Sequence, residues 1–313
     1  MSQPVELNPR AGRIATRLRC PACRLEQGLL IEPNGLLCPQ CNARYRVEQG
    51  LPILLNGSGA QMREAELSTD TGAAMVREYA QAGAAAVGPV RRGWRPPQLI
   101  WDDNPDMKAG FVRRVFDHAG PNTVVLNVGG GPRRYGAQDI NLNISGFHNV
   151  DLIADAHDIP LLSNSVDSIV CNAVLEHVRY PERVVEEMVR VLKPGGLLYA
   201  EVPFIFFFHG YPSDYRRYTY EGMRLLFGAL GELEVTLSGG PMSALLQTAN
   251  IVFEDMLPAQ PRFVRKAFNG AFRLLTFPLK YLDRMWRDKP HAPRVACGYR
   301  VLGRKPMAGA PHA

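Results

Sequence analysis

The sequence predicts an α/β protein with a doubly wound, mostly parallel sheet that follows a small cysteine-containing module. Two observations lead to this prediction. From residue 123 onward, short continuous apolar runs alternate with segments of helical periodicity, which is typical of a parallel sheet covered by helices on both faces. Before this part, two Cys-x-x-Cys pairs lie within residues 14–55.

Composition sets the outer bounds. A chain of 313 residues can bury a full core and an accessory module. The net charge of +6 allows nucleic acid, anionic lipid or phosphorylated glycan as partners without requiring one. The amino-terminal residues contain no apolar signal-peptide segment. The longest apolar stretch, 195–208, is interrupted by Glu201 and is shorter than the roughly 18 residues of a membrane span. We therefore expect a cytoplasmic protein.

The four clustered cysteines, Cys20, Cys23, Cys38 and Cys41, form a C-x2-C-x14-C-x2-C pattern. Each pair can place two thiolates at about 2.3 Å from one tetrahedral zinc ion. Paired motifs of this kind favour a metal site in a reducing compartment over a set of disulfides. The pattern predicts a structural zinc ion (Zn2+) with no open coordination position, and the alternative is redox or chance pairing.

The remaining elements follow in order. Residues 56–104 are rich in Gly, Ala and Ser and contain Pro96-Pro97, which predicts a linker with helices. A helix is predicted over 105–119, where Pro105 suits the first turn. The later strands and helices are expected at 123–128, 139–144, 150–156, 165–174, 181–192 (helix), 195–204, 219–230 (helix), 233–239 and 295–305.

An additional helical segment is expected at about 240–292. Within it, residues 262–287 place Phe268, Phe272 and Leu275 near one helical face, with basic residues around them. This basic amphipathic pattern has two interpretations. The segment is a helix that covers the domain, or it makes a peripheral contact with a membrane surface and presents a lipid-linked acceptor.

The run Val124-Val125-Leu126 leads into the glycine cluster Gly129-Gly130-Gly131. Phosphate-binding loops, dinucleotide-binding folds and methyltransferases all begin with a glycine turn after one strand. A phosphate-binding loop would continue with Gly-Lys-Ser/Thr, which is missing here. A dinucleotide fold would show G-x-G-x-x-G, whereas the next glycine after this cluster is Gly136. The glycine cluster alone does not separate the remaining alternatives.

Three downstream signatures decide between them. Asp155-Ala156 closes a strand and precedes Ile159-Pro160, "VCNAVLEHV" follows at 170–178, and "VLKPGG" lies at 191–196. In this order they resemble the class I S-adenosylmethionine-dependent methyltransferases (methyltransferase type 11-like), over roughly residues 105–240 plus the last strand. The resemblance implies a Rossmann-like, seven-stranded sheet in a domain over 105–305, with S-adenosyl-L-methionine as cofactor.

The same resemblance implies a set of cofactor-binding residues. They are Asn127, Gly129, Gly130, Gly131, Asn143, Asp155, Ala156, Asn172, Ala173 and His177. The glycines admit the amino-acid part of the cofactor, because a Cβ there would collide with it. Asn143 would hold the ribose hydroxyls, and Asp155 with Ala156 would lie beside the adenine. Asn172 and Ala173 would lie under the sulfonium, and His177 would pack nearby.

Two of these residues depart from the family pattern. Asn127 and Asn143 stand where the family usually has carboxylates, and Arg133 stands at the usual third glycine. An asparagine keeps an acceptor oxygen but loses the charge, which is worth about 1 kcal/mol per site, or roughly tenfold in affinity. We expect a working site of modest affinity, and the alternative is a non-catalytic cofactor-binding scaffold.

The acceptor is expected over the loop that follows the fifth strand. The segment "HGYPSDYRRYT", 209–219, resembles an element of methyltransferases that are often encoded with glycan or lipid-glycan assembly genes. Ligands bind beyond the carboxyl ends of the strands in such sheets. His209 is the candidate catalytic base, and Asp214 would orient it or serve instead. Alternatively, Asp214 and Arg217 only tie the loop together. The implied acceptor is a hydroxyl or carboxyl of a glycan, a lipid-linked intermediate or another small molecule.

RNA is the second candidate acceptor. The cysteine module ends in the tail "YRVEQGLPILL", 45–55, and residues 18–55 resemble short zinc-ribbon modules found beside methyltransferases. One family of ribosomal-RNA guanine methyltransferases also carries an amino-terminal zinc ribbon. Against this, the Asn/Asp-Pro-Pro-Tyr/Phe turn of exocyclic-amine methylation is replaced by "CNAV", 171–174. A closed zinc site does no chemistry, so we expect the ribbon to be structural or to hold a partner or substrate.

Overall fold

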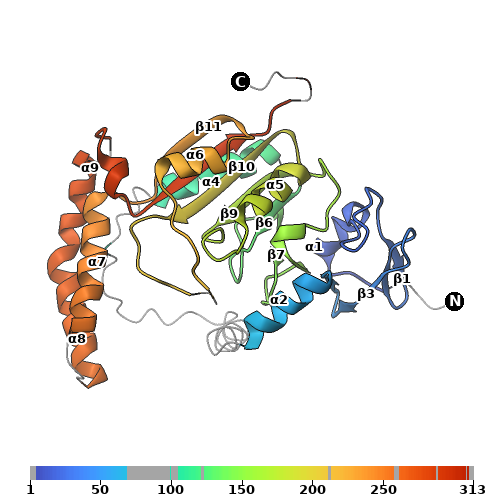
Figure 1. Ribbon diagram of the computed structural model, residues 1–313, viewed down its shortest axis with the longest axis horizontal. Helices are drawn as coiled ribbons and strands as arrows, with labels where there is room; N and C mark the ends of the chain where they lie inside the picture. The colour runs from blue at the N-terminus through green and yellow to red at the C-terminus, as the bar shows by residue number, and fades with distance from the viewer. Residues whose placement is uncertain are drawn as a thin grey trace.

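A computed structural model gives the architecture of the chain (Figure 1). It describes residues 5–68, 99, 105–120, 123–210, 213–256, 261–286, 288–307 and 309. The small antiparallel sheet of the cysteine module contains β1 (Leu30–Glu32), β2 (Gly35–Leu37) and β3 (Arg44–Tyr45). The large sheet contains, in spatial order, β11 (Gly231–Leu237), β12 (Gly298–Arg304), β10 (Leu192–Pro203), β9 (Val166–Asn172), β6 (Val125–Val128), β7 (Asp139–Asn143), β8 (Leu152–Ala154), β5 (Leu51–Leu54) and β4 (Val47–Glu48).

The large sheet is mostly parallel, as the alternation of strands and helices predicted. β6 pairs in parallel with both β7 and β9, and β10 continues in parallel beyond β9. β12 is reversed and lies antiparallel between β10 and β11. The chain order turns back between β6 and β9, and such a switch point is where doubly wound sheets bind ligands.

The described residues contain the seven strands expected for the methyltransferase segment, and the cysteine module adds two more to the same sheet. Seven strands, β6 to β12, come from the segment after residue 105. β5 extends their edge by pairing in parallel with β8, where Ile53 lies opposite Ile153 and Leu54 opposite Ala154. β4 then pairs antiparallel with β5. The buried side chains of Ile53 and Leu54 give this pairing its hydrophobic contribution.

Helices cover both faces of the sheet. α4 (Pro105–Ala119) packs Phe111 and Val115 in one cluster with Val170 of β9. α5 (Pro181–Val191) packs Val184 and other apolar residues in a second cluster with Ile169. Neighbouring strand residues point to opposite faces, so the two helices lie on opposite sides, with α5 in front in Figure 1. The predicted double winding is therefore confirmed.

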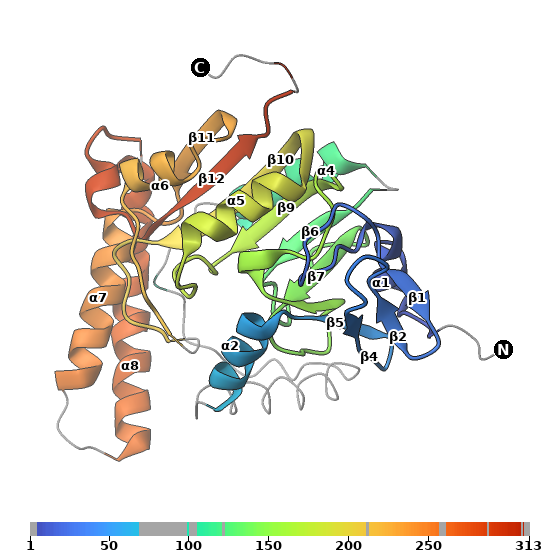
Figure 2. The same ribbon diagram turned by 45° about the vertical axis from the view of Figure 1, so that its right-hand side comes forward.

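A helical pair projects from the end of the sheet opposite the cysteine module (Figures 1 and 2). It follows α6 (Tyr220–Leu226) and β11 and consists of α7 (Pro241–Met256) and α8 (Arg262–Thr276), joined to β12 by α9 (Asp283–Trp286) and short 3-10 turns at Phe277–Leu282 and Ala292–Val295. Phe253 and Phe272 pack between the two helices with ring centroids 5.4 Å apart. Among the described residues, no helix is long and apolar enough to cross a membrane.

The cysteine module is fixed to the sheet by buried polar contacts as well as by β5. It begins with α1 (Pro9–Gly12) and a 3-10 turn at Ala15–Arg17. Arg19 is 4% exposed and donates to Asp158 at 3.1 Å, and its other amino group lies within 3.4 Å of Glu26. Leu18 forms an isolated bridge with Leu161 and belongs to the main core. The module therefore shares the hydrophobic core of the large sheet.

One helix of the predicted linker, α2 (Gly57–Ser68), is part of the described structure. Asn56 caps its start by accepting from the Gly59 amide at 2.8 Å. The Asn56 side chain also donates to Asp158 at 2.9 Å. A Cβ on Gly59 would lie 3.2 Å from the Cβ of Asp155. The start of α2 therefore packs against the end of β8, and the rest of the predicted linker, apart from residue 99, lies outside the described residues.

Candidate functional site

The glycine turn after β6 is shaped by the protein's own side chains. Gly129 and Gly131 have φ of +67° and +53°, which favour glycine. A Cβ on Gly129 would meet Val174 at 2.5 Å, and a Cβ on Gly130 would meet the side-chain nitrogen of Asn127 at 2.3 Å. A Cβ at Gly129 or Gly130 would thus collide with the protein's own side chains, even without a ligand. Only at Gly131 is the Cβ direction open.

Asn127 is connected to a buried carboxylate that sequence reasoning missed. Its side chain is 1% exposed, and Nδ2 donates to Oδ2 of Asp139 at 3.3 Å. Asp139 also accepts from the Tyr135 amide at 2.8 Å. Burial raises the pKa of Asp139 to about 6, against these hydrogen bonds. The acidic group absent from position 127 is therefore supplied by the start of β7.

The glycine turn fits a ligand that donates hydrogen bonds. Oδ1 of Asn127, Asp139 and Asn141 are all buried and accept no hydrogen bond from the described residues. Buried acceptors are ordinarily paired, so three together point to a donor group that is not part of the chain. A Cβ on Gly130 would lie 2.7 Å from Oδ1 of Asn141. The ammonium of the amino-acid part of S-adenosylmethionine has the donor chemistry that these oxygens lack.

Asn143 and Asp155 end β7 and β8 at the same edge of the sheet. Asn143 is 8% exposed, and its Oδ1 accepts from the Ser145 amide at 2.9 Å. Oδ1 of Asp155 accepts from the amide of His157 at 2.9 Å and lies 2.7 Å from its Nδ1. Burial opposes ionisation, but the His157 hydrogen bonds lower the pKa of Asp155 below its usual value. Asp155 is therefore an ionised acceptor, followed directly by Ala156.

The end of β9 is strained. Ala173 has φ of +56°, which is uncommon for a residue with a side chain. Its amide donates to the carbonyl of Glu201 on β10 at 2.9 Å. Oδ1 of the neighbouring Asn172 is buried and accepts no hydrogen bond from the described residues. Strained backbone of this kind is concentrated at functional sites. Asn172 and Ala173, the residues predicted to lie under the sulfonium, thus combine a strained backbone with a buried acceptor that has no partner among the described residues.

His177 and His209 come together, as the two parts of the predicted site require. Their rings are 5.0 Å apart and perpendicular, and both face the carboxylate of Glu176. His177 Nδ1 donates to the Ser213 carbonyl at 2.6 Å. The interaction with Glu176 raises the pKa of His209, with burial opposing it. The sequence showed Glu176 only as part of "LEH", and it is a further site residue.

Asp214 holds the loop that carries His209. Its side chain is 1% exposed and binds the guanidinium of Arg217 through both oxygens. Oδ2 also accepts from the His209 amide at 2.9 Å and lies 3.4 Å from His209 Nδ1. Burial opposes ionisation, yet Arg217 and His209 lower the pKa of Asp214 to about 2. Such a weak base is suited to positioning His209. Figures 1 and 2 show this loop between α2 and the α7–α8 pair.

The four cysteines of the module converge on one point. Sγ of Cys20 lies 3.6 Å from Sγ of Cys41, and Cys23 and Cys38 are also 3.6 Å apart. All four sulfurs lie within 4.8 Å of one another. A tetrahedral zinc ion with about 2.3 Å bonds would separate its sulfurs by about 3.8 Å. All six cysteines of the chain are free thiols, so the thiols present fit zinc.

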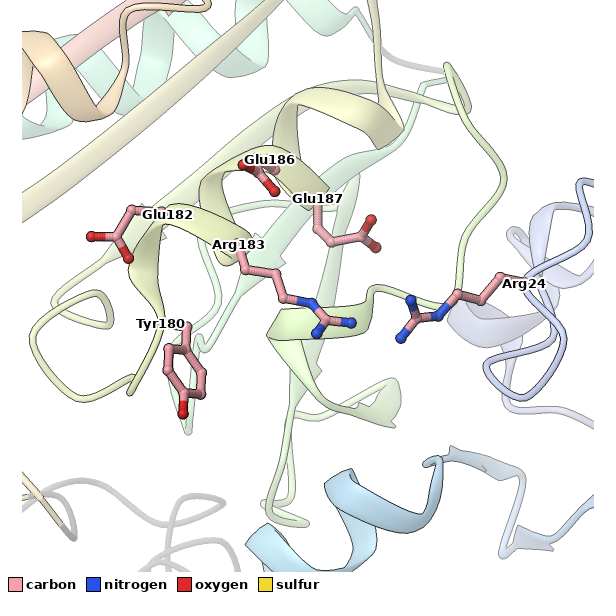
Figure 3. Close-up of a pocket in the computed structure, with 6 residues that line it drawn as sticks. All are labelled: Arg24, Tyr180, Glu182, Arg183, Glu186 and Glu187. Atoms are coloured by element: carbon pink, nitrogen blue, oxygen red, sulfur yellow. The ribbon is translucent and has the colours of Figure 1, made fainter.

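A separate cavity of 590 Å³ lies between α5 and the cysteine module (Figure 3). It is lined by Arg24, Tyr180, Glu182, Arg183, Glu186 and Glu187. In Figure 3 the guanidinium groups of Arg24 and Arg183 point toward each other. Tyr180 connects the cavity to the end of β8, because its amide donates to Nε2 of His157 at 3.3 Å. The cavity therefore borders the predicted cofactor residues, but none of them lines it.

The strand order agrees with the class I methyltransferase fold that the sequence resembles. Residues 132–200 match the family described as "Methyltransferase domain". An uncharacterised methyltransferase of Mycobacteroides abscessus is 36% identical over 89 residues, which are 28% of this chain and 34% of that protein. The thiol S-methyltransferase TMT1B of Rattus norvegicus is 51% identical over 39 residues, which are 12% of this chain and 16% of that protein. The chain thus spans about a third of the first relative and a sixth of the second.

Solved structures match this chain at low identity and with TM-scores below 0.5. Phosphoethanolamine N-methyltransferase 2 of Haemonchus contortus, in complex with S-adenosyl-L-methionine, has a TM-score of 0.42 and 15% identity, with 80% of this chain and 61% of that chain covered. Geranyl diphosphate C-methyltransferase of Streptomyces coelicolor has a TM-score of 0.39 and 10% identity, with 76% and 98% covered. Neither likeness bears on the acceptor of this chain.

Proposed function

We propose that this protein transfers a methyl group from S-adenosyl-L-methionine to a hydroxyl or carboxyl of a glycan, a lipid-linked intermediate or another small molecule. One observation carries the cofactor part of the proposal. Asn127, Asn143 and Asp155 lie at or next to the carboxyl ends of three adjacent parallel strands, and the buried oxygens around the glycine turn lack donors among the described residues. This is the edge at which doubly wound sheets bind nucleotide-like ligands.

The chain's own residues would divide the work between the two ends of the site. Asn127 and the glycine turn would hold the amino-acid part of the cofactor, Asn143 its ribose, and Asp155 with Ala156 its adenine. When bound, the cofactor supplies an electrophilic methyl group on sulfur. Asn172, Ala173 and His177 would border that end. An alcohol or acid acceptor must also lose a proton.

His209 is the group that we propose to receive the acceptor's proton. Its ring is 23% exposed, so it is reachable from solvent. Asp214 accepts from the His209 amide and is itself fixed by Arg217. In this arrangement Asp214 positions the imidazole and stabilises its protonated form, and it does not act as the base itself.

The α7–α8 pair supports a lipid-linked acceptor over a soluble one. Apolar side chains lie exposed along α8, where Leu275 is 78% and Phe263 is 73% exposed. Exposed Arg265 and Lys266 lie on the same helix. Exposed apolar and basic groups on one helix match the surface of an anionic membrane. We propose that 262–287 contacts such a surface and that the zinc-bound ribbon has a structural role.

Calorimetry with the cofactor and with its demethylated product tests the proposal. We expect binding of both by the wild-type protein, and a loss of one to two decades in affinity for Asp155→Ala. No binding at millimolar ligand would contradict the methyltransferase proposal, and binding without turnover on any acceptor would identify a scaffold. Nucleic acid that co-purifies in a fixed ratio would favour the RNA alternative.

A further inference from the structure

Three side chains at the acceptor end converge on one point, and the proposed methyl transfer assigns no role to one of them, Glu176. Oε1 of Glu176 lies 3.8 Å from Nε2 of His177 and 3.7 Å from Nε2 of His209. The side chain of Glu176 is fully buried, whereas those of His177 and His209 are 13% and 23% exposed. The cluster therefore has a closed end at the carboxylate and an open end at the two imidazoles.

The backbone determines which ring nitrogens carry hydrogen. Nδ1 of His177 lies 2.6 Å from the Ser213 carbonyl, and Nδ1 of His209 lies 3.1 Å from the Phe207 carbonyl. A carbonyl oxygen only accepts, so both Nδ1 atoms are the donors. In a neutral imidazole the other nitrogen, Nε2, then carries no hydrogen and presents a lone pair. The Nε2 lone pair of a neutral His209 consequently faces the Glu176 carboxylate, and this arrangement is repulsive unless a positive charge lies between them.

The two imidazoles lie beyond hydrogen-bonding distance of the Glu176 carboxylate, so they interact with it through space alone. Neither of its carboxylate oxygens accepts a hydrogen bond from the described residues. The charge of Glu176 helps to raise the pKa of Arg217, but the guanidinium of Arg217 donates its hydrogen bonds to both oxygens of Asp214. A buried carboxylate is retained in proteins when it is paired or when it coordinates a metal. Protonation of His209 is one source of the missing charge, and a bound cation is the other.

We propose that Glu176, His177 and His209 bind a divalent first-row transition-metal ion. Two imidazoles and one carboxylate form a ligand set that leaves coordination positions open. The Nδ1–carbonyl hydrogen bonds fix both rings in the tautomer that a metal requires. The three ligand atoms lie within 4.8 Å of one another, so small side-chain movements bring them to bonding distance of one ion.

The open positions indicate what such an ion would do. They would lie toward the exposed side of the imidazoles, next to the described loop residues 204–210 and 213–219. An oxygen of the acceptor would bind there and become more acidic, so that its proton could pass to water on the open side of the cluster. His209 would then be a ligand of the ion and not the proton acceptor. This use rests on the proposed function. Cation binding itself does not, because it can be measured without cofactor or acceptor.

The test uses the full-length, zinc-loaded protein with Mn²⁺ as the probe, because thiolates in the ribbon do not favour this ion. Titration followed by the electron paramagnetic resonance signal of free Mn²⁺ should reveal one class of sites. Glu176→Gln and His209→Ala should each weaken binding by at least tenfold. The matched controls Glu221→Gln and His118→Ala, at exposed positions on other helices, should bind as the wild type does.

Thermal melting of the same variants provides a second readout. Mn²⁺ should raise the melting temperature of the wild type and leave that of Glu176→Gln unchanged, because only the native site binds the ion. Without Mn²⁺, Glu176→Gln should melt no lower than the wild type, since it removes an uncompensated charge. Absence of Mn²⁺ binding, or binding that survives Glu176→Gln, would overturn the proposal and leave a protonated His209 as the partner of Glu176. A loss of cofactor binding alone would overturn only the methyltransferase proposal.

Discussion

Nδ2 of Asn127 lies 3.3 Å from Oδ2 of Asp139, so the two strands that border the glycine turn share one buried carboxylate between them. Asp139, on β7, therefore supplies beside the glycine turn the negative charge that the family pattern places at position 127, on β6. The asparagine at position 127 is therefore the donor that a buried carboxylate needs. This relationship changes what a substitution back to the family residue should do.

Asn127→Asp should destabilise the protein and should not tighten cofactor binding. It would place two buried carboxyl groups about 3.3 Å apart and remove the donor to Asp139. We expect a loss of roughly 1–3 kcal/mol in the free energy of unfolding, measured in urea. The double variant Asn127→Asp/Asp139→Asn moves the charge to the other strand and should recover much of that loss. Equal stability of the single variant and the wild type would contradict this account.

Asp139 should give the protein a specific pH dependence. Its folded pKa is about 6 against an ordinary 3.8, so the folded state binds the proton more tightly than the unfolded state. The stability from this group is complete below about pH 4 and is lost as pH rises through about 6, up to roughly 3 kcal/mol. Urea unfolding of wild type and Asp139→Asn at pH 5 and pH 7.5 measures it. The pH-dependent difference between the two proteins should be absent if the Asp139 carboxyl titrates normally.

Removal of zinc should unfold the amino-terminal module and weaken the edge of the large sheet. Elemental analysis should find about one zinc ion per chain in the wild type and a loss of zinc in Cys20→Ser. The matched control Cys297→Ser changes a buried cysteine outside the module and should keep its zinc. A stably folded, metal-free wild-type protein would rule out the zinc site.

His209→Ala should lower turnover by about 10²–10⁴, which is the usual contribution of a general base. The affinity for S-adenosyl-L-methionine should stay nearly unchanged, because the loop faces the acceptor. Asp214→Asn should also lower the melting temperature, since Asp214 holds Arg217 and the His209 amide. Kinetics, calorimetry and melting on the same two variants separate the roles. Unchanged turnover in both the His209→Ala and the Asp214→Asn variants would show that this loop does not take part in catalysis.

Binding to anionic vesicles should depend on the exposed face of α8. Leu275→Glu places a charge at a residue that is 78% exposed, and burying a leucine is worth about 1.5–3 kcal/mol, so partitioning should fall at least tenfold. Leu225→Glu, on α6 at 85% exposure, is the matched control and should bind as the wild type does. Co-sedimentation with phosphatidylglycerol and with phosphatidylcholine vesicles measures both variants. Equal loss in the two variants would contradict a contact specific to α8.

The elements that the sequence predicted are those with local signals. The run Val124–Leu126, the periodicity of 105–119 and the paired cysteines each lie within a few residues of one another. The pairing of Ile53 with Ile153 was not predictable, because a strand partner one hundred positions away leaves no periodicity in either segment. The three buried strand ends, Asn127, Asn143 and Asp155, lie together because parallel strands share one edge.

Asp139 and Glu176 escaped prediction for a different reason. Each is a single acidic residue with an apolar neighbour on one side only, and its importance depends on what lies opposite. Asp139 acquires its role from Asn127 on the adjacent strand, and Glu176 from His209, which follows a different strand. The aromatic and basic residues of the 209–219 loop are visible in the sequence, but the residue that they face is not. An acidic residue at the end of an otherwise apolar run is the signal that was available.

The addition of β5 and β4 beside β8 has a consequence for solubility. An unpaired edge strand exposes backbone donors and acceptors that recruit strands of other molecules. β8 is short and fully buried, with Leu152, Ile153 and Ala154 as its residues. Without the amino-terminal module, β8 would be an exposed, apolar edge strand that is prone to association. By covering this edge, the ribbon prevents self-association through β8. A chain that begins after residue 56 should therefore precipitate even where its remaining fold is intact.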